Sequence, residues 1–103
     1  MIKINGIDYK VRIDETLNYR GLIGECDYNS QSILLSPNMD GDRRDVVLWH
    51  EILHAIFEQI GEEQNEALID RLSYSIHGVL KTNASFSIYN MVLNKAHIPN
   101  LAL

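Results

Sequence analysis

Residues 43–61 read RRDVVLWHEILHAIFEQIG, and their apolar side chains recur at the spacing of an amphipathic helix. We expect a helix from about residue 43 to residue 60. Its expected core side consists of Trp49, Leu53, Ile56 and Ile60. Gly61 is placed to end the helix, because glycine readily adopts the left-handed conformation that follows a helix C-terminus. His50 and His54 share a different side of the helix.

The chain before this helix contains four extended runs, grouped in two pairs around turn-forming residues. Asn5-Gly6 separates the first pair, and both residues tolerate the positive φ angles of a tight hairpin. Asn29, Ser30 and Gln31 separate the second pair. The sequence therefore predicts a small antiparallel sheet of two hairpins, with strands at residues 2–4, 7–13, 22–28 and 32–36.

Helical spacing resumes after Gly61 in two further segments. A second helix is expected from about residue 63 to residue 81, where Thr82-Asn83 would end it. Its expected core stripe is Leu68, Leu72, Ile76 and Val79. A third helix is expected from about residue 85 to residue 95. The predicted fold is α+β, with the small antiparallel sheet followed by three helices in a single domain of residues 1–103.

Length, composition and charge limit the class of protein. A chain of 103 residues forms one domain, because separate cores need roughly 50 residues each. The net charge of -5 and the scattered basic residues argue against a nucleic-acid partner. The single Cys26 cannot form an internal disulfide, and no apolar run resembles a signal peptide or a membrane span. We therefore expect a cytoplasmic protein with no nucleic-acid or membrane partner.

The pattern His50-Glu51-Ile52-Leu53-His54 has the chemistry of a metal site. Residues four apart on a helix lie on one face roughly 6 Å apart, so both histidines can offer a ring nitrogen to one zinc ion. Glu51 points about a quarter turn away. That offset suits a carboxylate that does not bind the metal but takes a proton from a zinc-activated water. The pattern therefore predicts two zinc ligands and a catalytic base.

A catalytic zinc site usually has three protein ligands, so a third ligand must come from outside this helix. Glu66 lies near the start of the second predicted helix, one turn before Asp70 on the same face. If Glu66 binds zinc, Asp70 is placed to accept the outward N–H of a ligand histidine. Two alternatives stay open: Glu63 is the third ligand, or the protein supplies no third ligand.

The two motifs together, residues 50–54 and residues 65–70 (NEALID), resemble the gluzincin pattern of zinc peptidases. The resemblance implies one set of roles: zinc ligands His50, His54 and Glu66, general base Glu51, and Asp70 as support for a ligand histidine. Residues 4–83 are also similar to small zincin-like proteins of phages and prophages, often grouped with ImmA/IrrE-type metallopeptidases. This similarity implies a zincin-like fold with the first motif on the first long helix. The connection between the motifs is shorter than in larger gluzincins.

Other polar residues have weaker arguments from spacing. His77 lies three turns after Glu66 on nearly the same helix face, so it is a possible electrophile or extra ligand. The alternative for His77 is a partly buried structural histidine. Five tyrosines are candidates to stabilise an oxyanion, and the sequence does not rank them: Tyr9, Tyr19, Tyr28, Tyr74 and Tyr89.

These features predict a zinc-dependent metallopeptidase that hydrolyses peptide bonds in a peptide or protein substrate. One alternative is a zinc-binding but catalytically idle phage-type protein that acts by binding a partner. Another is a latent enzyme whose apolar tail, residues 97–103, occupies the cleft. The sequence specifies neither the substrate nor the oligomeric state.

Overall fold

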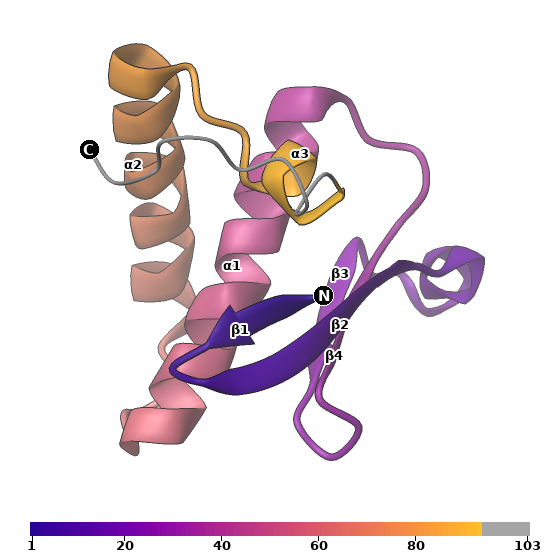
Figure 1. Cartoon of the computed structure of the whole chain (residues 1–103). Coiled ribbons are helices and arrows are strands. Elements are labelled where there is room, and N and C mark those ends of the chain that lie inside the picture. Colours follow the sequence, from indigo (N-terminus) through magenta and orange to yellow (C-terminus); the bar gives the residue numbers. More distant parts are fainter. Residues whose placement is uncertain (94–103) are drawn as a thin grey trace.

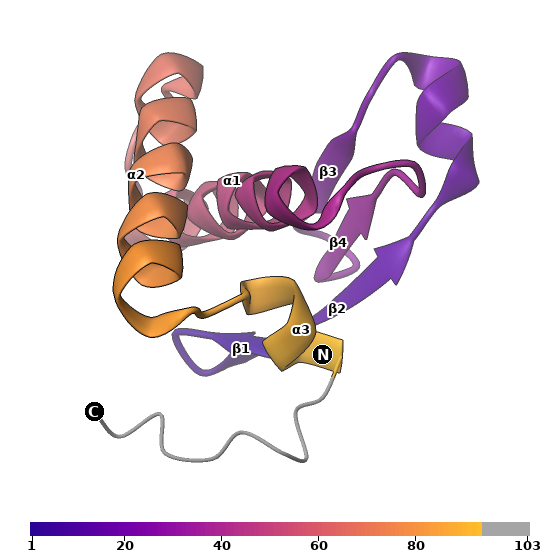
Figure 2. The same ribbon diagram turned by 90° about the horizontal axis from the view of Figure 1, so that it is seen from above.

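A sheet, a long central helix and an outer helix form successive layers of the protein (Figure 1). The computed structural model describes residues 1–93. Its elements are β1 (Ile2–Ile4), β2 (Ile7–Ile13), the 3-10 helix η1 (Glu15–Arg20), β3 (Gly24–Asp27), β4 (Ser32–Leu35), α1 (Gly41–Ile60), α2 (Glu66–Ala84) and α3 (Ile88–Leu93). Figure 2 shows α1 between the sheet and α2. The predicted α+β class is confirmed.

The strands of residues 1–93 pair in the order β1-β2-β4-β3. Both predicted hairpins are present, and Asn5 and Gly6 in the first turn have positive φ angles of 50° and 84°. The prediction of a wholly antiparallel sheet is wrong, because β2 and β4 pair in parallel, with Val11 opposite Ile33. Hairpin turns are encoded locally, whereas the pairing of one hairpin with the other depends on the path of η1. As a result β3 lies at one edge of the sheet.

The main helix α1 ends at Ile60 as predicted and begins at Gly41, two residues before the predicted start. The Asp40 side chain accepts a hydrogen bond from Arg43 N at 2.7 Å, and Gly61 ends the helix with a φ angle of 75°. The predicted core side is partly wrong, because Ile60 is 60% exposed. Four other residues of α1 join the core shared with the sheet: Val47, Leu48, Ile52 and Ala55. Since α1 is covered by both the sheet and α2, its buried positions fall on more than one side.

The second helix, α2, begins and ends later than predicted. The side chain of Asn65 accepts a hydrogen bond from Leu68 N at 3.1 Å, which caps the helix so that it starts at Glu66. The helix continues through Thr82-Asn83, the predicted end, and Ser85 follows it with a positive φ angle of 51°.

The face of α2 that packs on α1 differs from the predicted stripe by one position. Val79 is 62% exposed, and the buried residues of α2 are Ile69, Ser73 and His77. The two polar members are tolerated because each has a partner. Ser73 Oγ donates to the backbone oxygen of Asp70 at 2.7 Å, and His77 Nε2 lies 3.1 Å from Asp42 Oδ1. A hydrophobic pattern does not anticipate buried polar residues of this kind.

The short helix α3 packs against α1 through a buried carboxylate. Asp45 of α1 is 1% exposed, and its Oδ1 accepts hydrogen bonds from Ser87 Oγ at 3.0 Å and Tyr89 N at 2.9 Å. The helix begins at Ile88, three residues later than predicted, and the predicted end at residue 95 lies outside the described residues. The apolar tail of the latent-enzyme alternative, residues 97–103, lies outside the described residues. No helix within residues 1–93 is long and apolar enough to cross a membrane.

Candidate metal centre

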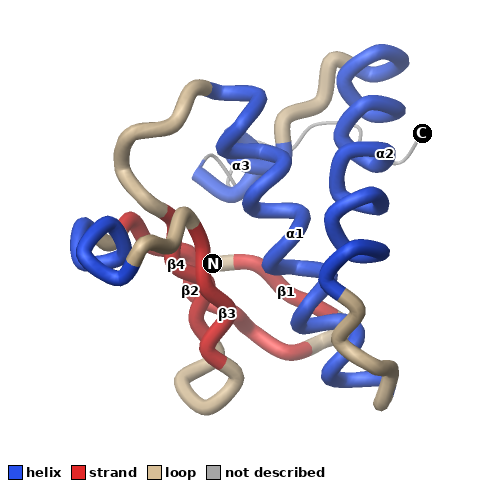
Figure 3. Tube along the Cα trace, turned by 180° about the vertical axis from the view of Figure 1, so that it is seen from behind, coloured by secondary structure: helices blue, strands red, loops and turns tan. Residues whose placement is uncertain are grey.

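The helices α1 and α2 lie side by side (Figure 3), and the turn between them brings His50 and His54 to the first residue of α2, Glu66. His50 Nε2 lies 3.0 Å from Glu66 Oε2, and His54 Nε2 lies 2.8 Å from Glu66 Oε1. The two Nε2 atoms are 3.2 Å apart. These three side chains are therefore close enough to bind one metal ion.

Gln64, in the turn before α2, determines which nitrogen of His54 has the hydrogen. Gln64 Nε2 donates to the backbone oxygen of His54 at 3.0 Å, so Gln64 Oε1 is the atom that faces His54 Nδ1, at 2.7 Å. Because an amide oxygen can only accept, Nδ1 must be the donor. The lone pair of neutral His54 is therefore on Nε2, the atom that faces Glu66.

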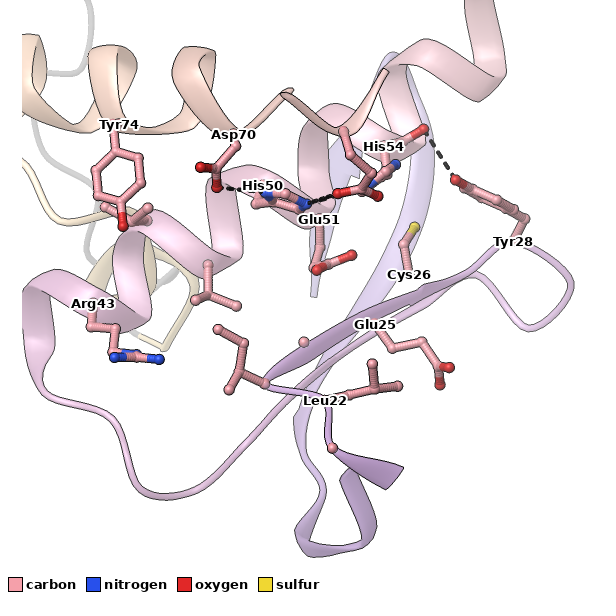
Figure 4. A pocket seen from close by; sticks show the side chains of 16 residues that line it. Leu22, Glu25, Cys26, Tyr28, Arg43, His50, Glu51, His54, Asp70 and Tyr74 are labelled. Atoms are coloured by element: carbon pink, nitrogen blue, oxygen red, sulfur yellow. Dashed lines mark hydrogen bonds and ion pairs between the residues drawn. The ribbon is translucent and has the colours of Figure 1, made fainter. Parts of the chain in front are cut away.

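Asp70 lies on the outer side of His50, with Oδ1 3.5 Å from His50 Nδ1 (Figure 4). This contact is longer than a strong hydrogen bond. A carboxylate at this position nevertheless favours a hydrogen on Nδ1, which leaves the Nε2 lone pair of His50 facing Glu66. Both histidines thus present an acceptor nitrogen to the same carboxylate.

The cluster of His50, His54 and Glu66 consists of acceptors that face one another. A nitrogen lone pair 2.8 Å from a carboxylate oxygen is repulsive unless a proton or a metal ion lies between the two atoms. The side chains of His50 and His54 are 18% and 11% exposed, whereas the Glu66 side chain is 70% exposed. Two imidazole nitrogens and one carboxylate form a donor set suited to a transition-metal ion. The three side chains therefore form a candidate metal site.

Glu51 follows His50 in α1, but its side chain points toward β3 (Figure 4). The residue is 7% exposed, and within residues 1–93 its carboxylate has no hydrogen-bond partner. Burial, together with the negative charges of Glu66 and Glu25, raises the pKa of Glu51 to about 8. A carboxylate with such a pKa can exchange a proton near neutral pH.

A cavity of about 660 Å³ lies between β3, α1 and the start of α2. The metal-site cluster, Glu51 and Asp70 line it on the helical side, and β3 lines it on the other. The two sides approach closely at Gly24, where a Cβ atom would lie 2.9 Å from Glu51 Oε2 and 2.7 Å from Val47 Cγ1. Because Gly24 has no side chain, β3 can lie directly against Glu51.

Two further side chains from the β3 region line the cavity, Cys26 and Tyr28 (Figure 4). Burial and the charge of Glu51 raise the pKa of Cys26 to about 12, so the thiol stays protonated at neutral pH. Burial, followed by the charges of Cys26 and Glu51, raises the pKa of Tyr28 to about 12. The Tyr28 hydroxyl donates a long hydrogen bond of 3.5 Å to the backbone oxygen of His54.

Most of the residues singled out in the sequence line this one cavity. They are His50, Glu51, His54, Glu66 and Asp70. His77 is not among the lining residues, because it pairs with Asp42 on the far side of the helix interface. Glu63, the alternative third ligand, is exposed and is not a member of the cluster.

The tyrosines divide into two groups. Tyr28 and Tyr74 line the cavity, whereas Tyr9 and Tyr89 are buried in the core and Tyr19 is 90% exposed elsewhere. The sequence analysis did not anticipate Gln64, although an amide in the short connection between two helices with candidate ligands is a usable signal. It also did not anticipate Arg43, which lines the end of the cavity near Tyr74 (Figure 4).

No protein-family model, curated protein or solved structure matches this chain. What the site can do is therefore argued from its own residues. Those residues form a cluster close enough to bind a metal ion, next to a buried carboxylate of raised pKa and a cavity of about 660 Å³.

Proposed function

We propose that this protein is a zinc-dependent peptidase that hydrolyses peptide bonds with Glu51 as the general base. The observation that carries the proposal is the convergence of His50 Nε2, His54 Nε2 and the Glu66 carboxylate beside a buried, unpaired Glu51. The resemblance of the same residues to the gluzincin pattern supports it independently of the distances.

The donor set and its spacing fit zinc. Tetrahedral zinc with bonds of roughly 2.0–2.1 Å holds its ligand atoms about 3.3 Å apart. His54 Nε2 lies 2.8 Å from Glu66 Oε1, His50 Nε2 lies 3.0 Å from the other carboxylate oxygen, Oε2, and the two Nε2 atoms are 3.2 Å apart. With one ligand atom taken from each residue, the three atoms lie within 4.8 Å of one another. Two histidines and one glutamate leave one of the four tetrahedral positions for water or substrate. Zinc, when bound, supplies a Lewis acid that polarises a carbonyl group and lowers the pKa of water.

The protein's own residues supply proton transfer and orientation. Glu51 accepts the proton of the attacking water and later delivers it to the leaving amine, a role that its raised pKa favours. Gln64 and Asp70 hold the outward nitrogens of His54 and His50, which keeps both Nε2 lone pairs directed at the metal. The Tyr28 hydroxyl keeps its hydrogen at neutral pH and is the nearest described tyrosine donor to His54.

The unpaired edge of β3 is the surface we assign to an extended substrate. β3 ends the strand order and lines the cavity, so its free backbone groups can pair with a peptide. β3 runs in the same direction as α1, since Gly24 lies beside Glu51 and Tyr28 beside His54. A peptide paired antiparallel to β3, the more stable arrangement, would therefore place its carboxyl-terminal side toward Gly24.

The test combines metal content with turnover for the full chain. We expect zinc at one equivalent per chain in the wild type, strong depletion in Glu66→Ala, and retention in the control Glu63→Ala, which changes an exposed glutamate of the same turn. We also expect cleavage of an unfolded protein substrate that is abolished in Glu51→Gln with zinc still bound. Undiminished zinc in Glu66→Ala would refute the ligand set. Bound zinc without any cleavage would favour the idle, partner-binding alternative.

A further inference from the structure

Arg43 lines the cavity at a distance from the metal-site cluster. It lies seven residues before His50 in α1, which corresponds to about 10 Å along the helix axis. Figure 4 shows its side chain at the end of the cavity opposite Tyr28. Arg43 is thus well placed to contact a part of the substrate remote from the metal.

The guanidinium of Arg43 has no ion-pair partner among residues 1–93. The acidic residue just before it, Asp42, is engaged by His77 at 3.1 Å and Lys81 at 3.5 Å. Across the cavity, Glu25 is occupied by a two-bond pair with Arg20, each bond 2.9 Å long. Arg43 is therefore the one unpaired arginine or lysine among the described lining residues.

Tyr74 of α2 lies at the same end of the cavity as Arg43 (Figure 4). The contacts of α1 with α2 run from His50–Glu66 to Asp42–His77, so Arg43 and Tyr74 lie between these two pairs. Tyr74 is 62% exposed although it is a large aromatic residue. Together the two side chains offer one fixed positive charge and one hydroxyl donor.

We propose that Arg43, assisted by the Tyr74 hydroxyl, binds a carboxylate of the substrate three residues on the carboxyl-terminal side of the cleaved bond. The proposal rests on the peptidase function argued above and adds a substrate class to it. A guanidinium forms two parallel hydrogen bonds with a carboxylate, which suits it to this recognition.

Chain length and direction set the position of that carboxylate. An extended peptide advances about 3.3 Å per residue, so about 10 Å corresponds to three residues. A peptide antiparallel to β3 runs from the Tyr28 end toward the Gly24 and Arg43 end, which makes these residues the ones after the cleaved bond. The carboxylate can belong to an aspartate or glutamate side chain or to the terminus of a short peptide.

The first experiment measures kcat/KM of the zinc-loaded full chain on matched fluorogenic peptides. One pair has Glu or Gln at the third position after the cleaved bond, and a second pair ends there with a free carboxylate or an amide. We expect wild type to prefer the acid of at least one pair by roughly tenfold. A preference within the Glu/Gln pair indicates a side-chain carboxylate, and a preference within the second pair indicates the carboxylate of a peptide terminus. Cleavage of all four peptides at equal rates would overturn the proposal and leave the peptidase function standing.

Variants connect that preference to the assigned side chains. Arg43→Ala should abolish the preference, and Arg43→Glu should reverse it in favour of a peptide with Lys at the same position. The matched control Arg12→Ala, which removes an exposed arginine of β2 outside the cavity, should keep the tenfold preference. A preference that survives in Arg43→Ala would contradict the assignment.

A binding experiment separates this proposal from the peptidase function. Zinc-loaded Glu51→Gln protein is titrated with the same labelled peptides, and anisotropy gives the dissociation constants without turnover. If wild type cleaves nothing, tighter binding of the acidic peptide that disappears in the double variant Glu51→Gln/Arg43→Ala would support the carboxylate site alone. Equal binding of acid and amide peptides would overturn it.

Discussion

Gly24 of β3 and Glu51 of α1 lie so close that a methyl group on the glycine would come within 2.9 Å of the Glu51 carboxylate. The same methyl group would lie 2.7 Å from Val47 Cγ1. Contacts this short force the strand or the carboxylate to move. The edge of the sheet and the candidate base are therefore positioned by one another.

Gly24→Ala should consequently damage both stability and catalysis. We expect a loss of about 1–3 kcal/mol in the free energy of unfolding, the usual cost of an overpacked site. Urea denaturation measures this loss, and kcat should fall because Glu51 is displaced. The matched control is Gly78→Ala, where a Cβ meets nothing within 4 Å in the middle of α2. That change should stabilise the protein by about 0.5–1 kcal/mol, and an equal loss at both glycines would contradict the steric explanation.

The stability of the metal-free protein should fall as the pH rises from 5 to 8. The pKa of Glu51 is raised from 4.5 to about 8 in the folded state, so folding favours the protonated acid. Above the unfolded value, ionisation opposes folding by up to about 1.4 kcal/mol per pH unit until the folded pKa is passed. Glu51→Gln removes this contribution, so wild type should lose stability relative to the variant between pH 5 and pH 8. Denaturation in chelator at several pH values measures the difference.

A matched control for the pH experiment is Glu62→Gln, since Glu62 is exposed in the turn after α1. Its stability should follow that of wild type across the same range. Parallel curves for wild type and Glu51→Gln would show that burial of Glu51 has no effect on the folding equilibrium.

Gln64→Ala should weaken zinc binding although it leaves all three ligands in place. Without the amide, His54 Nδ1 loses its acceptor, and partner groups of this kind typically affect metal affinity by roughly 10–100-fold. Gln64→Glu retains an acceptor for Nδ1 and should recover most of the affinity. Competition with a fluorescent zinc chelator gives the constants. Equal affinities for wild type, Gln64→Ala and the neighbouring control Glu63→Ala would refute the orienting role.

His77→Ala should reduce stability without reducing zinc content. His77 is 9% exposed and holds Asp42, so its loss should cost about 1–2 kcal/mol in unfolding experiments. The hydrogen bond from His77, followed by the charge of Lys81, holds the pKa of Asp42 below its usual value. Asp42 therefore stabilises the folded protein above the pKa that it has in the unfolded chain. This stabilisation is lost as the pH falls through the lowered pKa of the folded state. Zinc loss in His77→Ala would instead support its role as an extra ligand.

The sequence predicts the features that depend on neighbouring residues. Asn5-Gly6 and the Gly61 stop are local signals, and each appears in the structure where it was expected. The helical spacing of His50 and His54 and the one-turn relation of Glu66 to Asp70 are local as well. Short-range geometry therefore suffices to nominate the candidate ligands.

The sequence did not predict the features that depend on tertiary packing. The parallel pairing of β2 with β4 joins segments separated by η1 and β3, and no local pattern specifies it. The buried face of α2 includes Ser73 and His77, whose partners lie elsewhere, so a hydrophobic stripe assigns the wrong positions. Gln64 and Arg43 gained their roles only from the way α1 and α2 pack together.

The open edge of β3 has a consequence for behaviour at high concentration. An unpaired strand edge can bind the same edge of another copy and so begin aggregation. Glu25 on this strand is paired with Arg20, but Asp27 has no ion-pair partner among residues 1–93, so pairing of two copies would bring the negative charges of two Asp27 side chains into one sheet. This repulsion opposes pairing between two copies of β3. A peptide strand with basic residues would not be repelled in this way, so the edge of β3 favours such a peptide over a second copy of the protein.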